Sequence, residues 1–153
     1  MRRLVLLFAT ATASAVGCAP AEEEPAQEQA AAAPTVSLAD LAGAWTVTAT
    51  AESSDSVLIT YELNATATQD GWTSTLPGRE PMPVRVLLVD GDSVVAEAGP
   101  FESALRPDVM VTTRTVARLQ GDVLTGTMVA HYDTDAAGDS VLVGRLRGIR
   151  KTQ

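Results

Sequence analysis

The chain has 153 residues, enough for one domain with a single core, and its 19 acidic and 11 basic residues give a formal net charge of −8. An acidic chain without a basic cluster argues against nucleic acid as a partner and against electrostatic docking on anionic lipid. A single cysteine excludes an intramolecular disulfide.

Residues 1–17 have the layout of a secretory signal peptide. Arg2 and Arg3 form a positive start, residues 4–8 are continuously apolar, and small residues and threonines follow. This apolar stretch is shorter than the roughly 20 residues that a membrane-spanning helix needs. The sequence therefore predicts export, with residues 1–17 acting as the signal.

The only cysteine, Cys18, follows this segment directly. Ala15-Val16-Gly17-Cys18 resembles the lipobox of bacterial lipoproteins, where small residues precede a cysteine that is acylated, although that family prefers Leu where this chain has Ala15. The resemblance implies a protein held at the lipid bilayer of the cell envelope by acyl chains, palmitate among them. Ala19 rather than Asp after the cysteine implies the outer membrane, facing the periplasm or the cell surface. The alternative is an ordinary signal peptide that leaves Cys18 as a free thiol.

Residues 18–36 form the expected tether. Residues 19–34 contain only Ala, Pro, Glu and Gln, so they cannot bury enough apolar surface to offset the entropy of ordering. We therefore expect lipidated Cys18 and a disordered Ala/Pro/Glu tether to hold a folded domain, residues 37–153. That domain keeps 15 of the 19 acidic and 9 of the 11 basic residues, a formal charge of −6.

A short helical turn is expected at the start of the domain, over residues 37–43. Ser37 can cap it, Asp40 lies near its N-terminus, and Gly43 can end it.

From residue 44 onward the hydropathy period changes to two, which is typical of half-buried strands. The pattern predicts about eight strands, at 44–51, 56–68, 72–76, 84–89, 93–98, 109–119, 123–132 and 140–150. Residues 99–108 are expected as the longest connection within the domain. No long helix intervenes to join parallel strands, so the predicted class is all-β, an antiparallel up-and-down barrel. A sandwich of two small sheets is the alternative.

Gly43-Ala44-Trp45 follows the helical turn and opens the first strand. This G-x-W pattern resembles the signature of lipocalins and related calycin barrels, and LTGTM at 124–128 resembles small bacterial lipocalin-like lipoproteins. The resemblance implies that Trp45 closes one barrel end beneath an arginine from near the last strand, a favourable cation–π pair. The candidates are Arg145, Arg147 and Arg150. The alternative is a different small β fold in which Trp45 is a core residue.

No combination of residues indicates catalysis or a metal site. His131, the only histidine, alternates onto the outer face of its strand. The loop DTDAAGD at 133–139 matches three positions of an EF-hand, but Ala137 and Gly144 stand where calcium ligands are needed. A polar hairpin loop is the preferred interpretation, with a weak non-EF calcium site as the alternative. We predict no enzyme, with no catalytic residue, metal or cofactor.

The barrel interior carries the predicted function. Many strand positions are Ala, Thr, Gly or Val, which leaves room for a small apolar ligand. The alternation predicts the lining residues Trp45, Val47, Ile59, Tyr61, Leu63, Val86, Met128 and Leu146. The alternative is a filled barrel that acts as a structural or protein–protein interaction module in the envelope, with Met110 and Val116 on its outer face.

Overall fold

The computed structural model describes residues 35–136 and 138–152. The predictions for the signal peptide, for Cys18 and for the tether up to residue 34 lie outside the described residues. Val36, assigned to the tether from the sequence, belongs to the folded part. Its backbone N–H donates to the Gly91 carbonyl at 2.8 Å, and its side chain packs against the core.

Helix α1 (Leu38–Leu41) confirms the expected helical turn. Ser37 is its N-cap, and a capping box joins it to Asp40, whose carboxylate accepts from the Ser37 backbone N–H at 3.1 Å. The helix ends one residue earlier than expected, because Ala42 is the C-cap and Gly43 already belongs to the first strand. Within the described ranges, no helix is long and apolar enough to cross a bilayer.

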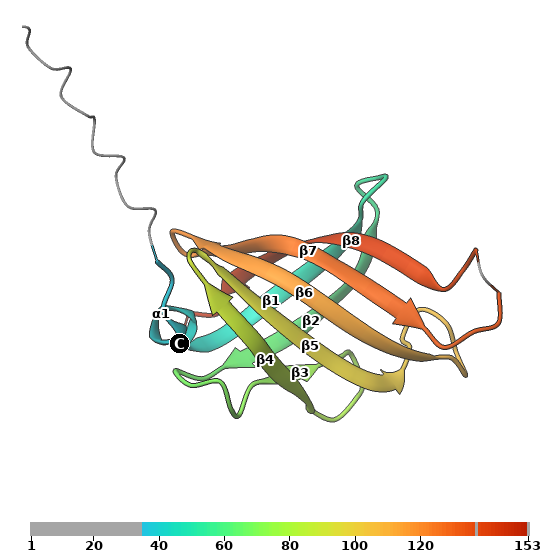
Figure 1. The fold of residues 1–153 in the computed structure, drawn as a ribbon, viewed down its shortest axis with the longest axis horizontal. Helices are drawn as coiled ribbons and strands as arrows, with labels where there is room; N and C mark the ends of the chain where they lie inside the picture. Colours follow the sequence, from blue (N-terminus) through green and yellow to red (C-terminus); the bar gives the residue numbers. More distant parts are fainter. Residues whose placement is uncertain (1–34, 137, 153) are drawn as a thin grey trace, which may run out of the picture. The chain divides into compact units, whose positions relative to one another are not determined.

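Eight antiparallel strands close into one barrel in sequence order (Figure 1). Their bounds are β1 (Gly43–Ala51), β2 (Val57–Ala65), β3 (Thr73–Thr75), β4 (Met82–Asp90), β5 (Ser93–Glu102), β6 (Met110–Gln120), β7 (Val123–Tyr132) and β8 (Val141–Arg150). Strand β1 pairs with both β2 and β8, so the sheet closes on itself and leaves no two-sheet sandwich. The all-β up-and-down barrel predicted from the sequence is therefore confirmed.

Strand β5 runs further than the alternation predicts, to Glu102 rather than residue 98. The β5–β6 pairing has an irregularity between Ala98 and Phe101, which takes in Gly99 and Pro100. A proline cannot donate to a strand ladder, but it is tolerated at a bulge. Gly-Pro here marks a bulge within a strand, where the sequence analysis expected a loop.

Strand β3 is shorter than expected, and β2 ends at Ala65 instead of residue 68. The chain between them folds onto Trp72, whose indole Nε1 donates to the carbonyls of Thr66 at 3.1 Å and Thr68 at 2.9 Å. These two carbonyls are used by a side chain and not by a sheet ladder, so the strands stop short of the residues that alternate in the sequence.

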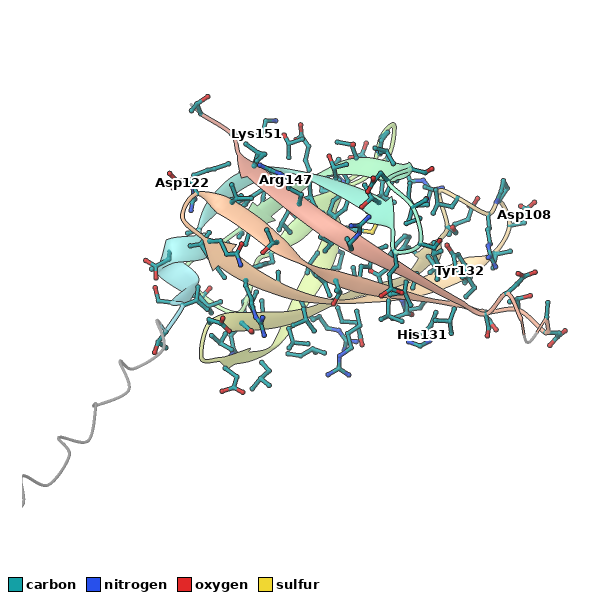
Figure 2. The ribbon with its side chains drawn as sticks, turned by 90° about the horizontal axis from the view of Figure 1, so that it is seen from above. Asp108, Asp122, His131, Tyr132, Arg147 and Lys151 are labelled. Carbon is teal, nitrogen blue, oxygen red and sulfur yellow. The ribbon has the colours of Figure 1, made fainter. Side chains whose placement is uncertain are left out.

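The barrel has two dissimilar ends. The capped end carries α1, the β2–β3, β4–β5 and β6–β7 connections and the residues after β8. The open end carries the connections 52–56, 76–81, 103–109 and 133–140. Figure 1 shows α1 at one end and the β7–β8 connection at the other, and Figure 2 shows Asp122 and Lys151 near the first end and Asp108 toward the second.

Candidate functional site

Trp45 closes the capped end. Its side chain is completely buried, and its indole Nε1 donates to the Leu41 carbonyl at 2.9 Å. The Arg150 guanidinium lies 4.2 Å from the indole ring and also donates to the carbonyls of Asp40, at 2.6 Å, and Ala42. Of the three candidate arginines, Arg150 is therefore the one over Trp45, and it binds the carbonyl groups that a helix end leaves without partners.

Both the backbone conformation and the available space require a glycine at position 43, the first residue of the G-x-W pattern. Gly43 has φ +134°, a backbone conformation that L side chains rarely adopt. A Cβ at this position would lie 2.8 Å from Arg150 Nη1. The glycine thus leaves the space in which the guanidinium reaches the indole and the end of α1.

Side chains fill the interior next to Trp45. Val47 is 3% exposed and Leu146 is 8% exposed, both in one core cluster with Trp45, and Val86 packs against that cluster. These four residues were predicted to line a ligand cavity. In the structure they belong to this core cluster or pack against it, and none of them lines the interior cavity.

A cavity of about 110 Å³ occupies the remaining interior. Inward-facing residues of β2 to β7 line it, together with Ser103, Ala104 and Leu105 of the connection after β5. Among the described residues, none from β1, β8 or α1 lines it. Ala104 and Leu105 are exposed, so the cavity extends to the surface at the open end.

Four of the predicted lining residues do lie along this cavity: Ile59, Tyr61, Leu63 and Met128. The sequence analysis missed the small residues that create the space, above all those of β6, which are Val111, Thr113, Thr115 and Ala117. These residues alternate with exposed ones along the strand, but the predicted lining was built mainly on large apolar side chains. A run of small inward residues on one strand was the signal that could have located the cavity.

Several hydroxyl groups interrupt the apolar lining, and those of Ser74 and Tyr61 lie on the neighbouring strands β3 and β2. Ser74 is only 6% exposed, and Tyr61 lies deep enough that burial raises the pKa of its phenol to about 12. Neither hydroxyl has a hydrogen-bond partner among the residues that the structure describes. Both residues line the cavity.

Arginines join the connections around the open end. Arg79 donates to the carbonyls of Glu102 and Ser103, and Arg106 donates to the Asp139 carbonyl while its guanidinium lies 4.1 Å from the Tyr132 ring. These bonds link the β3–β4, β5–β6 and β7–β8 connections.

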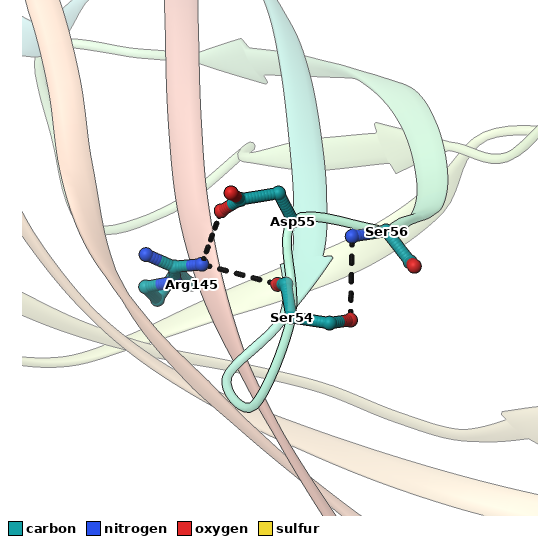
Figure 3. Close-up of polar contacts among 4 residues, drawn as sticks. All are labelled: Ser54, Asp55, Ser56 and Arg145. Atoms are coloured by element: carbon teal, nitrogen blue, oxygen red, sulfur yellow. Dashed lines mark hydrogen bonds and ion pairs between the residues drawn. The ribbon is translucent and has the colours of Figure 1, made fainter.

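The β1–β2 turn is tied in separately. Arg145 on β8 donates to the Ser54 carbonyl at 3.1 Å and pairs with the Asp55 carboxylate at 2.9 Å (Figure 3).

Charge is distributed unevenly between the two ends. The four open-end connections, with Glu102 and Arg145 at their margins, carry eight carboxylates and three guanidinium groups, a formal charge of −5. The domain as a whole carries −6, so almost all of its net charge surrounds the mouth of the cavity.

His131 is exposed on the outside of β7, as predicted, while its neighbour Tyr132 points inward (Figure 2). The residues described by the structure contain no cluster of three or more His, Cys, Asp or Glu side chains that could hold a metal ion.

Comparison with known protein families, with characterised proteins and with solved structures found no match to this chain.

Proposed function

We propose that this chain is a non-catalytic, lipid-anchored protein of the cell envelope whose barrel binds a small apolar ligand. The observation that carries the proposal is the apolar cavity of about 110 Å³ between β2 and β7. Ligand sites are usually concave and apolar with a few polar groups, and an apolar cavity of roughly 150 Å³ accommodates benzene. The ligand is therefore about the size of one aromatic ring or a short branched chain, smaller than a long-chain fatty acid.

The packed half of the barrel supports this function indirectly. Trp45, Arg150 and α1 do not line the cavity, although the core cluster around Trp45 extends to the lining residues Trp72, Leu124 and Met128. The residues of β6 can then remain small at little cost to the fold, and the space between them is available to a guest.

A cavity-filling variant tests ligand binding. Thr115→Leu adds apolar volume at a lining position between Ala96 and Met128. Thr127→Leu makes the same change on the outer face of the adjacent strand, where the side chain is exposed. Native mass spectra of protein extracted from its envelope should show a small adduct in the wild type and in Thr127→Leu but not in Thr115→Leu. Equal adducts in all three would place the guest elsewhere and refute the proposal.

The membrane anchor is proposed from the lipobox-like residues before Cys18. A single acyl chain gives marginal membrane binding, whereas two or more hold a protein stably. Denaturing mass spectrometry of the envelope-bound protein should give the mass of residues 18–153 plus at least two acyl chains. Cys18→Ser should be released from the membrane fraction; recovery of that variant in the membrane would contradict the anchor.

The outer face supports a second candidate function, the binding of an envelope protein. The β4–β5 pairing is irregular between Val86 and Leu88, so that Leu87 and Leu88 are both exposed. Leu88 continues through Val95 to Val116 as an apolar row across three strands. Contiguous exposed apolar surface is typical of protein interaction sites. A photocrosslinker at position 88 should capture a discrete envelope protein, while one at exposed Arg147 on β8 should not.

A further inference from the structure

The cavity combines an apolar wall with hydroxyl groups that lack partners, among them those of Ser74 and Tyr61 on two neighbouring strands. Ser74 lies on β3 opposite Leu63, and its side chain is 94% buried. Every fully enclosed side-chain oxygen or nitrogen among the described residues has a hydrogen bond. The Ser74 hydroxyl has none, so it is not fully enclosed and opens onto the cavity that Ser74 lines. A hydroxyl that opens onto a cavity is free to bond to a molecule in it, and a ligand with a matching polar group gains that hydrogen bond.

Tyr61 provides the second hydroxyl on the neighbouring strand. Its residue lines the same cavity, two positions before Leu63, the residue paired with Ser74. The phenol remains protonated at neutral pH, because burial disfavours its anion. It can therefore both donate and accept, as can the serine hydroxyl.

No unpaired ionised side chain lines the cavity in its described part. The only charged residue along the described part of the cavity is Glu97, and its carboxylate pairs with Arg85, whose side chain is 67% exposed outside the barrel. Arg79 and Arg106 bind backbone carbonyls around the open end and do not line the cavity. A carboxylate inside would thus lose its hydration without gaining a cation, which is strongly unfavourable. The charge of −5 around the mouth also lowers the local concentration of anions.

We propose that the cavity selects an uncharged small apolar molecule with one hydroxyl or carbonyl group, which hydrogen-bonds to Ser74 and Tyr61, and that it rejects carboxylates of the same size. This inference rests on the proposed ligand-binding function and specifies its ligand class. The apolar body of the ligand packs against the small residues of β6, and its polar group points toward β2 and β3.

The probes are toluene and phenol, which are nearly equal in size, and benzoate, whose size is matched by uncharged benzamide. Benzamide is expected to bind, so that exclusion of benzoate reports its charge and not its size. Each probe is titrated into the Cys18→Ser chain, which keeps every other residue and cannot be acylated, and binding is followed by amide chemical shifts at neutral pH. We expect toluene and phenol to shift amides of β2, β3 and β6, and benzoate to shift none. In Ser74→Ala and in Tyr61→Phe, phenol should bind about tenfold more weakly, while toluene should change by less than twofold.

The outcomes separate the two proposals. If neither toluene nor phenol binds, both the ligand-binding function and this inference fail. A second outcome is that toluene and phenol bind, but Ser74→Ala and Tyr61→Phe lower the affinity for both probes equally or for neither. The cavity then binds apolar ligands, but the hydroxyl groups do not select among them. Benzoate binding as tight as that of phenol would overturn the inference by itself. Toluene serves as the control for folding, since a variant that still binds it retains the cavity.

Discussion

The two ends of this barrel use similar residues to different effect. At the capped end Arg150 lies 4.2 Å from the ring of Trp45, and at the open end Arg106 lies 4.1 Å from the ring of Tyr132. Arg150 joins the last strand to the helix before the first strand, and the indole beneath it is surrounded by core side chains. Arg106 joins two surface connections, and the ring beneath it borders a cavity.

This difference separates a closely packed part of the fold from the part that borders the cavity. Packing density at the capped end supplies stabilising contacts, since close-packed apolar side chains contribute most of the favourable free energy of folding. Small residues at the open end give up such contacts and leave space. A ligand site can exist there because the opposite end holds the barrel closed.

Replacing Trp45 should disrupt the packing of the capped end and cause the largest decrease in the free energy of unfolding. Trp45→Ala deletes a completely buried indole, for which the expected loss is about 4–5 kcal/mol in the free energy of unfolding. Trp72→Ala removes an equally large ring that borders the cavity, so the loss should be smaller by at least about 1 kcal/mol. Urea unfolding of both variants measures the difference. Equal losses would show that the cavity wall at Trp72 is packed as tightly as the core around Trp45.

The two arginines that lie over aromatic rings should give the next largest change in the free energy of unfolding. Arg150→Met keeps an apolar stem but removes two hydrogen bonds to carbonyls and the cation–π contact, with an expected cost of about 2–3 kcal/mol. Arg106→Met, the matched change at the open end, should cost less than about 1 kcal/mol, because its hydrogen bond and ring contact lie among surface connections. A cost for Arg106→Met as large as that for Arg150→Met would contradict the assignment of stability to the capped end.

Much of this fold could be predicted because strand pairing follows local signals. The period-two alternation and the Asp-Gly and Gly-Asp turns located every strand, and they placed His131 outward. The errors lie where a tertiary contact overrides the pattern. Trp72 binds the carbonyls of Thr66 and Thr68 and so shortens β2, and a bulge carries β5 past Pro100.

The candidate site could be predicted only in part. Alternation tells which face a residue occupies, but it does not tell how far the opposite wall lies. Trp45, Val47 and Leu146 face inward as expected and lie in the core without bordering the cavity. Met128 belongs to the same core cluster and Tyr61 packs against it, yet both border the cavity. The distinction depends on which strands oppose each other across the closed barrel, and this arises from side chains that are distant in the sequence.

The cavity end should respond to alkaline pH through Tyr61. Burial raises the pKa of its phenol from 10.0 to about 12, so folding favours the neutral form. This contribution is fully present below pH 10 and is lost as the pH rises from about 10 through 12, an expected loss of roughly 2 kcal/mol. The free energy of unfolding, measured with urea, should therefore decrease over this pH range more for the wild type than for Tyr61→Phe. Parallel curves for the two proteins would show that Tyr61 is reached by solvent.

The capped end should respond to acid through Asp40, with the smallest effect. The Ser37 hydroxyl and backbone N–H both donate to this carboxylate and hold its pKa below the ordinary value of 3.8. Because the folded-state pKa is depressed, the capping box stabilises the fold above about pH 4, and this contribution is lost as the pH falls through the folded-state pKa. The carboxylate is fully solvent-exposed, so only a small difference in melting temperature between the wild type and Asp40→Asn is expected near neutral pH. That difference should shrink toward zero as the pH falls below the folded-state pKa of Asp40. A difference that persists in acid would mean that the Asp40 side chain acts through packing on α1 rather than through its charge.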